Sequence, residues 1–424
     1  MANDEPALAA MRRVRLYGSP LSPHAYELRD FLNRSVVEYD WTELHTDDEA
    51  RRLPGIASLT DAGLPLCVLP DGVRLAAPTV HEVAQHLGWV TEPKLAEYDV
   101  SIYGAGPAGL SAAVYAASEG LRTVLIERHT VGGQAGSSSL IENYMGFPQG
   151  VSGAHLAEMA RQQAVKFGVD ILHMREGVNA VFKDGRIVVD LADGSLMTAR
   201  ANICATGIEW RRLGLPNEAR LLGAGLFYGA GVSEAPMCGG ETVYVVGGGN
   251  SAGQAAMHLA QYAEQVIMLI RGEGLAETLS QYLVAKIEAQ ANIRVVGGCE
   301  VAGVEGDATL REITVRNRRD GTATALPASR LFVCIGGVPH TEWAKDTAIV
   351  RDRSGYLVTG TDLYANGRLP EAWPLQREPF YLETSVPGSF AAGDVRHNSV
   401  KRVASAVGEG AMAVTFVHRV LAGS

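Results

Sequence analysis

Two segments of the chain repeat one pattern of apolar, glycine and polar positions. Residues 98–128 and 242–271 each begin with a short apolar run, pass through closely spaced glycines into an alanine-rich stretch, and end in a second apolar run. Short apolar runs without polar alternation are typical of strands buried on both faces, and a helix that joins two such strands makes them parallel. The pattern predicts two βαβ units, each in its own dinucleotide-binding domain.

The region before the first unit has the pattern of a separate small α/β domain. It predicts a strand at 13–18, a helix at 23–35, a hairpin formed by 64–70 and 73–77, and a closing helix at 79–88. Residues 90–97 are the expected linker. Residues 361–380 are polar, non-periodic and interrupted by prolines, which predicts a long loop.

Composition narrows the class of protein. The 424 residues are 47% apolar and 20% charged, the balance of a soluble globular α/β protein. A net charge of -10 argues against nucleic acid as the main partner. No run of about 18 apolar residues predicts a membrane span, and the first residues lack the pattern of a signal peptide. We expect a cytoplasmic protein.

The cysteines indicate neither a disulfide framework nor a metal site. There are five, at positions 67, 204, 238, 299 and 334, and no two have the C-x-x-C spacing. Scattered cysteines in odd number suit a reducing compartment. Any dithiol would have to be assembled by the fold.

The first glycine turn has the residues of a dinucleotide site. Gly104, Gly106 and Gly109 form G-x-G-x-x-G directly after a strand and at a helix start, where a pyrophosphate can approach the backbone and the helix N-terminus. Glu127 ends the second strand, in position to bind ribose hydroxyls. Strand, glycines, helix and terminal acid together predict a bound dinucleotide.

Five segments give this prediction a family. "GAGPAGLSAAVYAASEGLRTVLIER" (104–128), "GGQ" (132–134), "IENYMGFP" (141–148), "ICATG" (203–207) and "VPGSFAAGDV" (386–395) follow one another as in low-molecular-weight thioredoxin reductases, which residues 97–424 resemble. The resemblance implies an α/β fold class with two Rossmann-like domains, in which an FAD domain is split around an NAD(P)-binding domain. The expected domains are 1–92 (thioredoxin fold), 97–212 and 334–424 (FAD) and 213–333 (NAD(P)H). The family's homodimer is the expected assembly.

The resemblance also implies an FAD site, residue by residue. Its members are Gly104, Gly106, Pro107, Ala108, Gly109, Glu127, Arg128, Gly133, Gln134, Asn143, Val178, Thr206, Gly207, Gly393, Asp394, Lys401, Arg402 and Val403. Asp394 would offer acceptors to sugar hydroxyls. The helix expected at 401–421 would stabilise negative charge on reduced flavin through its dipole. The family usually has Arg-Gln-Ala at positions 401–403, and an arginine at 402 favours the anionic form unless its side chain extends into solvent.

The second glycine turn predicts NADP. Gly247, Gly249 and Ala252 form G-x-G-x-x-A. Ile270 stands where Glu127 stands in the first unit, and Arg271 follows, a combination that favours a 2′-phosphate. Thioredoxin reductases have two adjacent arginines here, so half of that clamp is missing. The implied NADP site comprises Gly247, Gly249, Asn250, Ser251, Ala252 and Arg271.

The redox disulfide of thioredoxin reductases has no counterpart. Their C-x-x-C precedes the second glycine turn, where this chain has "YGAGVSE" (228–234). Cys238 lies nearer the strand without a partner close in sequence, and we interpret it, like Cys204 and Cys334, as a core residue. Dithiol exchange is therefore not expected.

The N-terminal region resembles glutaredoxins and the N-terminal domains of glutathione transferases. Ser22-Pro23-His24-Ala25 stands where glutaredoxins have C-P-x-C, and Pro65 is the proline that is cis in thioredoxin folds. Both redox cysteines are replaced. The domain would serve docking or dimer formation, or be kept for stability alone.

A few side chains are weaker candidates. His24, His129 and His397 could donate protons near a flavin or be ordinary structural residues. Trp373 and Tyr381 could cover the flavin face or anchor an exposed loop. No catalytic residue and no metal ligand is assigned.

The sequence thus predicts an FAD-dependent NAD(P)H oxidoreductase without an internal redox disulfide. Electrons would pass between NADPH, or another donor, and an unidentified small molecule or protein that meets the flavin directly. Two alternatives remain: a ferredoxin-linked reductase of the same fold, and a non-catalytic flavin-binding sensor.

Overall fold

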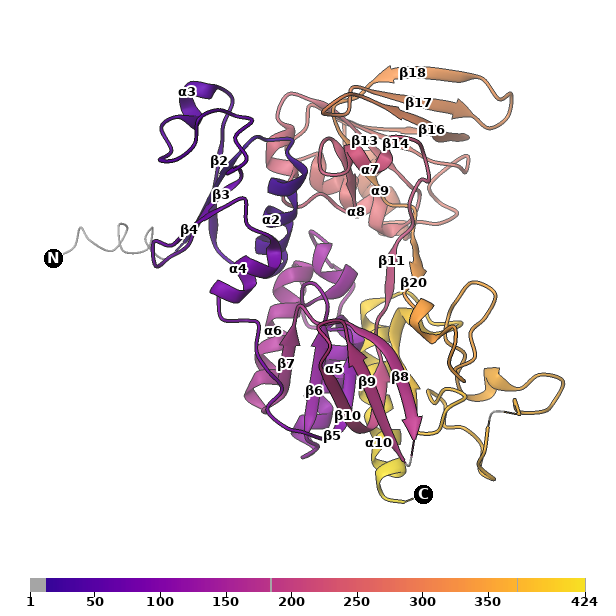
Figure 1. Ribbon diagram of the computed structural model, residues 1–424. Helices are drawn as coiled ribbons and strands as arrows, with labels where there is room; N and C mark the ends of the chain where they lie inside the picture. The colour runs from indigo at the N-terminus through magenta and orange to yellow at the C-terminus, as the bar shows by residue number, and fades with distance from the viewer. Residues whose placement is uncertain (1–12, 184, 372, 424) are drawn as a thin grey trace. The chain divides into compact units, whose positions relative to one another are not determined.

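The computed structural model describes residues 13–183, 185–371 and 373–423, which form two compact units (Figure 1). The first unit contains the described residues up to Val83, Ser137–Ser139 and Trp210–Gly336. The second contains Ala84–Gly136, Leu140–Glu209 and the described residues from Gly337 onward. The prediction that the first residues are not a signal peptide concerns mainly residues 1–12, which lie outside the described residues.

The second unit is built on a seven-stranded sheet of order β7-β6-β5-β10-β9-β8, with β21 beside β10. Strands β5, β6, β7, β10 and β21 are parallel, while β8 and β9 form an antiparallel hairpin. The strands are β5 (Tyr98–Tyr103), β6 (Thr123–Glu127), β7 (Asp170–His173), β8 (Gly177–Lys183), β9 (Arg186–Leu191), β10 (Leu196–Cys204) and β21 (Ser389–Ala391). The remaining elements are α5 (Pro107–Ser118), η1 (Gly133–Ser137), α6 (Gly153–Lys166), β11 (Ile208–Trp210), β20 (Gly337–Pro339), η3 (Glu342–Ala344), η4 (Gly360–Leu363), η5 (Gly393–Val395) and α10 (Val403–Leu421). The last residues of η1 and β11, Ser137 and Trp210, belong to the first unit.

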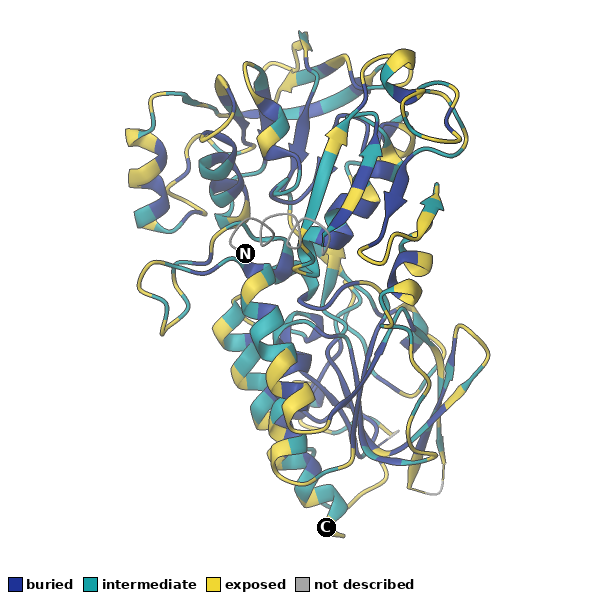
Figure 2. Ribbon diagram, turned by 90° about the vertical axis from the view of Figure 1, so that its left-hand side faces the viewer, coloured by how far each residue is buried: buried dark blue, intermediate teal, exposed yellow. Residues whose placement is uncertain are grey.

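Small residues bring the helices of this unit together. A Cβ atom on Gly410 of α10 would come within 2.1 Å of the Ala108 carbonyl oxygen on α5, so the two helices meet backbone to backbone. The alanines of α5 and the apolar strands β5 and β10 form one buried core with α10. Figure 2 shows these strands as buried while the helices expose their outer sides. The core fixes the first turn of α5 against α10 at Gly410.

The first unit contains a five-stranded parallel sheet of order β12-β19-β13-β14-β15. Its elements are α7 (Glu218–Leu221), β12 (Leu226–Tyr228), η2 (Ala235–Cys238), β13 (Thr242–Val246), α8 (Asn250–Leu259), β14 (Gln265–Leu269), α9 (Gln281–Ala289), β15 (Ile293–Val296) and β19 (Leu331–Val333). A separate antiparallel sheet consists of β16 (Cys299–Glu305), β17 (Glu312–Asn317) and β18 (Ala323–Pro327). Both predicted βαβ units and the α/β fold class are confirmed.

The N-terminal part of the same unit forms a four-stranded sheet of order β2-β1-β3-β4. Its elements are β1 (Val14–Gly18), α2 (Pro23–Arg34), β2 (Tyr39–Glu43), α3 (Asp47–Ala50), β3 (Leu66–Val68), β4 (Arg74–Ala76) and α4 (Val80–His86). Ser22 caps α2, since its hydroxyl accepts from the Ala25 N–H, and Pro23 starts the helix. The predicted strand, hairpin and helices are confirmed, and the Leu64–Pro65 peptide is cis.

Two predicted segments differ in detail. The C-terminal helix begins at Val403, so Lys401 and Arg402 precede it. Residues 361–380 are irregular apart from η4, as predicted. Trp373 anchors them: it is buried, donates from Nε1 to the Arg377 carbonyl over 2.8 Å and contacts the Arg377 guanidinium.

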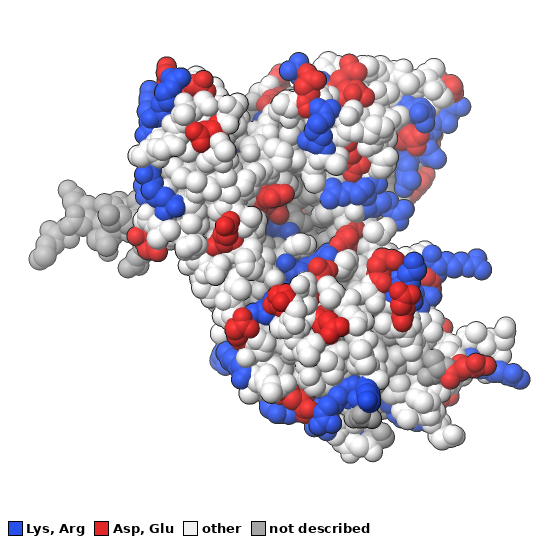
Figure 3. Space-filling model, in the orientation of Figure 1, with Lys and Arg blue, Asp and Glu red and all other residues white. Residues whose placement is uncertain are grey.

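Neither a membrane span nor a metal cluster emerges from the described residues. None of their helices combines the length and apolar character needed to cross a bilayer. They also contain no group of three or more His, Cys, Asp or Glu placed to hold a metal ion. Acidic and basic side chains are interspersed on the face drawn in Figure 3, without an extended surface of one sign.

Candidate functional site

The first glycine turn joins β5 to α5 through two close backbone approaches. Gly104 has φ +99°, and a Cβ atom there would lie 2.4 Å from the Ala205 carbonyl oxygen at the end of β10. A Cβ atom on Gly109 would lie 1.8 Å from the Gly104 carbonyl oxygen. Gly106 meets only Gly133 Cα, at 3.9 Å, so its side is open. The turn is tight on the protein side and leaves the N-terminus of α5 accessible to an anion.

Glu127 holds the turn through its carboxylate. Oε2 accepts from the Ala105 N–H over 2.7 Å, and Oε1 accepts from the His129 N–H over 2.8 Å. The side chain is only 7% exposed. Each oxygen keeps a lone pair for a further donor, so Glu127 can orient a ribose while it fixes two loops.

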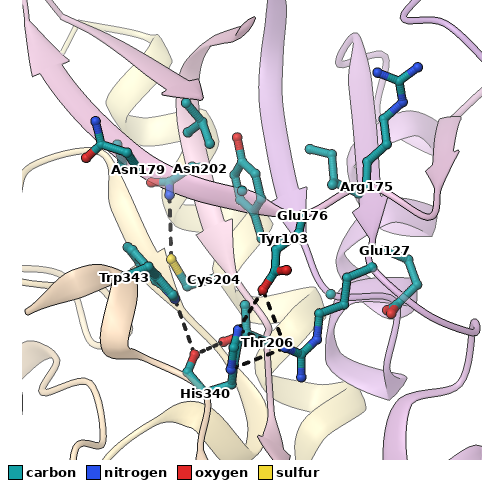
Figure 4. A pocket seen from close by; sticks show the side chains of 16 residues that line it. Tyr103, Glu127, Arg175, Glu176, Asn179, Asn202, Cys204, Thr206, His340 and Trp343 are labelled. Atoms are coloured by element: carbon teal, nitrogen blue, oxygen red, sulfur yellow. Dashed lines mark hydrogen bonds and ion pairs between the residues drawn. The ribbon is translucent and has the colours of Figure 1, made fainter. Parts of the chain in front are cut away.

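A pocket opens at the carboxyl ends of β5, β6 and β10, the edge where open α/β sheets bind ligands (Figure 4). It is lined by Tyr103, Gly104, Ile126, Glu127, Arg128, Arg175, Glu176, Gly177, Asn179, Ala180, Val189, Asn202, Cys204, Thr206, His340 and Trp343. The predicted residues Gly104, Glu127, Arg128 and Thr206 are therefore brought together, and the β8–β9 hairpin forms one wall.

One wall carries a charged cluster that the sequence does not indicate. Arg128 Nη1 lies 3.0 Å from His340 Nε2 and 3.4 Å from Glu176 Oε1, and Nη2 contacts Glu209. His340 also lies 3.1 Å from Glu176 and from Glu209. Figure 4 shows His340 and Glu176 directed toward each other. The cluster fixes the Arg128 guanidinium beside the pocket.

Two further contacts shape the pocket. The His340 carbonyl oxygen accepts from Thr206 Oγ1 and from Trp343 Nε1, both over 3.2 Å. Asn202 is buried, and its carboxamide oxygen accepts no hydrogen bond from the described residues. A buried acceptor without a donor is rare in proteins unless a ligand or water completes it. These residues fit the adenosine end of FAD, which offers donors of that kind.

Gly393 and Asp394 lie at the start of the two long helices. A Cβ atom on Gly393 would be 2.8 Å from Ala108 Cβ on α5 and 3.6 Å from Ala406 Cβ on α10. The Gly393 N–H donates to Glu409 Oε2 over 2.7 Å. Burial raises the pKa of Asp394, opposed by Lys401. The structure thus places Gly393, the residue before Asp394, against the first turn of α5. Contact of the Asp394 carboxylate with FAD stays a prediction.

The residues before α10 fill different places. Lys401 Nζ donates to the Asp394 carbonyl over 2.9 Å and to Ser399 Oγ over 2.8 Å. Arg402 is exposed, and its Nη1 donates to the Lys401 carbonyl. Of the two alternatives for this side chain, the structure has the one in which it extends into solvent. Arg402 occupies the N-cap position, but its side chain makes no cap hydrogen bond. The first N–H groups of α10 thus have no side-chain acceptor at the cap.

The other predicted FAD residues are spread around the turn. A Cβ atom on Gly133 would lie 3.1 Å from Gly106 Cα, so this glycine lies against the turn. Val178 is 48% exposed and does not line the pocket, although its neighbours Gly177 and Asn179 do. Asn143 is exposed. The remaining positions are Pro107 and Ala108 in α5, Gln134 in η1, Gly207 after β10 and Val403 in α10. Their contact with FAD stays a prediction.

The second glycine turn, after β13, is formed in the same way as the first. A Cβ atom on Gly247 would come within 2.2 Å of the Cys334 carbonyl oxygen, whereas Gly249 has nothing within 4 Å. Asn250 is tied to Ser280 by two hydrogen bonds of 3.0 and 2.8 Å. Ser251 and Ala252 lie in the first turn of α8. The helix N-terminus is free to meet a pyrophosphate.

Arg271 follows β14 as predicted, and a second arginine stands beside it. Arg271 is exposed, and its carbonyl oxygen accepts from Arg318 Nη1 over 3.2 Å. Arg318 comes from the turn after β17, so no local motif indicates it. Arg319 is directed instead to Glu273, at 2.6 Å. The fold therefore brings the Arg318 guanidinium to the backbone of Arg271, while its Nε lies 3.7 Å from Glu300 Oε2.

The cysteines are buried free thiols. Cys67, Cys204, Cys238, Cys299 and Cys334 are at most 5% exposed. Burial raises the pKa of Cys238 to about 12, and its Sγ donates to the Glu234 carbonyl. Thiols of this kind are poor nucleophiles. The interpretation of Cys204, Cys238 and Cys334 as core residues is confirmed.

The candidate histidines are engaged in structural contacts. His24 Nε2 lies 2.7 Å from the Pro78 carbonyl, and His397 Nδ1 lies 2.7 Å from Asp352 Oδ2. The His129 N–H donates to Glu127. Tyr381 is 48% exposed and stacks under the Arg396 guanidinium.

Comparisons with known proteins agree on one family. Residues 98–410 match the model of the pyridine nucleotide-disulphide oxidoreductase family. The chain is 33% identical over 317 residues to a thioredoxin reductase of Treponema pallidum, covering 75% of this chain and 95% of the relative. It is 31% identical over 327 residues to a "34.2 kDa protein in rubredoxin operon" of Clostridium pasteurianum, covering 77% and 98%. Thioredoxin reductase structures from Lactococcus lactis and T. acidophilum superpose with TM-scores of 0.68 at 25% and 27% identity, covering 77% and 78% of this chain and 100% of each structure.

Proposed function

The chain belongs to the pyridine nucleotide-disulphide oxidoreductase family, whose thioredoxin reductase members use FAD and NADPH. We propose that it transfers electrons from NADPH through FAD to an acceptor that meets the flavin directly, without a redox dithiol of its own. The burial of the cysteines carries this proposal. None of the five thiols is more than 5% exposed, and the segment 228–234 holds no sulfur.

The residues of the second unit would each have a defined task. Glu127 holds the glycine turn and orients the ribose, while the N-terminus of α5 receives the pyrophosphate. Asn202 and Thr206 bind the adenosine end, and Asp394 accepts from hydroxyls of the ribityl chain. FAD, when bound, supplies the two-electron chemistry. The uncapped N-terminus of α10 favours negative charge nearby through its N–H groups and dipole.

The first unit would hold the nicotinamide dinucleotide. The open N-terminus of α8 receives the pyrophosphate, and Arg271 with Arg318 pairs with a 2′-phosphate. Both arginines lie at an exposed edge, which suits a nucleotide that binds and leaves in each turnover. No aspartate or glutamate takes the place of Glu127, because Ile270 occupies that position and is buried.

The N-terminal domain supports the same proposal. Its strand order, the parallel pair β1–β2 and the helix α2 between them support the thioredoxin-like fold that the sequence resemblance implies. Ser22 and Ala25 replace the redox cysteines, and burial raises the pKa of its one thiol, Cys67, to about 11. This domain would therefore not relay electrons.

The test is anaerobic mixing of the FAD-bound protein with excess NADPH, followed by flavin absorbance. We expect full bleaching with NADPH, slower bleaching with NADH, and no reduction of a disulfide-bonded thioredoxin. If dithionite bleaches the flavin but neither nucleotide does, the proposal is wrong. The protein would then be a reductase that takes electrons from another donor, or a flavin-binding sensor. Rapid thioredoxin reduction would contradict the absence of a dithiol relay.

The name of one relative favours a second acceptor class. A protein from a rubredoxin operon spans most of this chain, so a small iron protein is a candidate acceptor. Reduction of added rubredoxin by NADPH in the presence of the enzyme, at a rate well above that of a quinone or oxygen, would select it.

A further inference from the structure

A buried ion pair joins two parts of the first unit that lie far apart in the sequence. Arg29 on α2 donates from Nη2 to Glu234 Oε1 over 2.6 Å, and the two side chains are 1% and 0% exposed. Glu234 ends the segment 228–234, immediately before η2. The pair therefore connects the N-terminal domain with the place where the family resemblance would put a dithiol.

The ion pair lies within an apolar contact. Tyr26 of α2 meets Phe227 of β12 with ring centroids 5.2 Å apart, and Phe227 stacks on Phe332 at the same distance. Leu21 and Tyr26 pack against the core of the nucleotide-binding sheet. The N-terminal helix is thus seated on the core of its neighbour by aromatic and aliphatic contacts.

The start of α2 faces this neighbour. A Cβ atom on Gly223 would lie 2.8 Å from Pro23 Cα and 3.0 Å from Tyr26 Cδ1. Pro23 lies between Ser22 and Ala25, the positions of the replaced redox cysteines. The end of the N-terminal domain that is catalytic in glutaredoxins is thus turned toward the nucleotide-binding domain.

The surroundings of the pair fix its geometry. Glu234 also accepts from Ser233 Oγ over 2.6 Å, and the Arg29 guanidinium lies 4.4 Å from the Trp41 ring. Burial raises the pKa of Glu234, and Arg29 opposes that rise. A buried charge that loses its partner destabilises its surroundings strongly, whereas replacing both charges by apolar groups is often tolerated. The Arg29–Glu234 pair therefore favours a single packed position of α2 on the nucleotide-binding domain.

We infer that the N-terminal domain is a fixed cover over residues 223–238 rather than a mobile arm, and that this face is closed to a second protein. The inference rests on the proposed function in one respect: a protein that accepts electrons from the flavin would not bind on residues 223–238. An external redox protein would have to displace α2, which requires breaking the Arg29–Glu234 pair and exposing Tyr26 and Phe227.

Hydrogen–deuterium exchange of the full FAD-bound chain tests the cover. In the wild type, peptides from 23–34 and 228–238 are expected to exchange slowly and together. In Arg29→Met, both should exchange about 100-fold faster or more, since Glu234 is left buried without its partner. Peptides from α5 in the second unit should not change. Arg34→Met is the matched control, because Arg34 pairs with Asp30 on the same helix at 3.4 Å.

A second pair of variants separates the cover from a general loss of stability. Arg29→Met with Glu234→Leu should recover most of the slow exchange, and Arg29→Lys should lie between the wild type and Arg29→Met. Fast exchange of 228–238 in the wild type would overturn the inference, as would acceleration of 23–34 alone in Arg29→Met. These outcomes do not depend on whether NADPH bleaches the flavin, so the inference and the proposed function can fail separately.

Discussion

The glycine turns after β5 and after β13 begin alike and end differently. Gly104 and Gly247 both have positive φ, +99° and +134°. In both, a Cβ atom would collide with a carbonyl oxygen of the next parallel strand, Ala205 at 2.4 Å and Cys334 at 2.2 Å. The start of each turn is dictated by the sheet, so this part of the motif reports the fold more than the ligand.

The ends of the turns differ in the groups that surround them. In the first, α5 lies so close that a Cβ on Gly109 would be 1.8 Å from the Gly104 carbonyl, and Glu127 fixes two loops from within the protein. In the second, Ala252 carries a methyl group at the equivalent position, Ile270 replaces the acid, and the exposed Arg271 follows it. The first turn lines a pocket together with a buried carboxylate, whereas an exposed arginine follows the second. Under the proposed function, this difference suits a retained cofactor at the first turn and an exchanging nucleotide at the second.

The sharpest test of this difference is a methyl group at each turn. Gly109→Ala should force α5 away from its strand, since overpacking of this kind costs about 1–3 kcal/mol, and flavin content should fall to about one-tenth or less. Gly249→Ala should keep full flavin, because nothing lies within 4 Å of the added methyl. Flavin absorbance per purified protein measures both. Equal flavin loss in the two variants would remove the distinction between the turns.

The next largest effect is expected at Glu127. Glu127→Gln keeps the shape but removes the charge and one acceptor for the Ala105 and His129 N–H groups. A lost hydrogen bond to a charged group costs about 1.5–3 kcal/mol, so FAD should bind about 10–100-fold more weakly. Titration of flavin-free protein with FAD measures the affinity. Glu119, which follows α5 and is 47% exposed, provides the control. Glu119→Gln should leave the affinity for FAD unchanged.

Both turns could be predicted from the sequence, because strand, glycines, helix and following residue are adjacent in the chain. Arg128 was predicted at the FAD site, but its cluster with Glu176, Glu209 and His340 was not. Those three come from separate segments, and each looks like an ordinary surface residue in its own segment. Their proximity is a product of topology, which no local pattern encodes.

The N-terminal contact illustrates the same limit. Sequence patterns predicted the strand, helices and hairpin of this domain, and the burial of Cys238. They did not predict that Arg29 would be buried, because an arginine in a helix usually reaches solvent. Only the partner Glu234, from a distant segment, makes that burial possible.

A smaller effect, on the KM for NADPH, should distinguish Arg271 and Arg318 from the neighbouring Arg319. Arg271→Ala and Arg318→Ala should each raise the KM for NADPH about 5-fold, the effect of losing about 1 kcal/mol at an exposed charged contact. The KM for NADH should not change, because NADH lacks the 2′-phosphate. Arg319→Ala is the control, because the Arg319 guanidinium is directed to Glu273, at 2.6 Å, whereas Arg318 reaches the Arg271 carbonyl. Steady-state kinetics with both nucleotides decide this; equal effects on NADH would exclude the phosphate role.

The smallest effect concerns two aspartates, one in each unit, whose contributions to stability should change with pH in opposite directions. Burial raises the pKa of Asp394, so the folded, flavin-free protein loses stability as the pH rises from the ordinary aspartate value through the raised one. Asp394→Asn should therefore melt at the same temperature as the wild type in acid and up to about 2 °C higher near neutral pH.

Asp320 should show the opposite trend. Hydrogen bonds from Thr322 lower the pKa of Asp320, so its carboxylate stabilises the fold above the ordinary aspartate pKa. That stabilisation is lost as the pH falls through the lowered pKa. Asp320→Asn should accordingly melt lower near neutral pH, with the difference vanishing in acid. Melting curves of the flavin-free variants across pH would show opposite trends if Asp394 is a buried acid kept for a ligand, and parallel trends if both are surface caps.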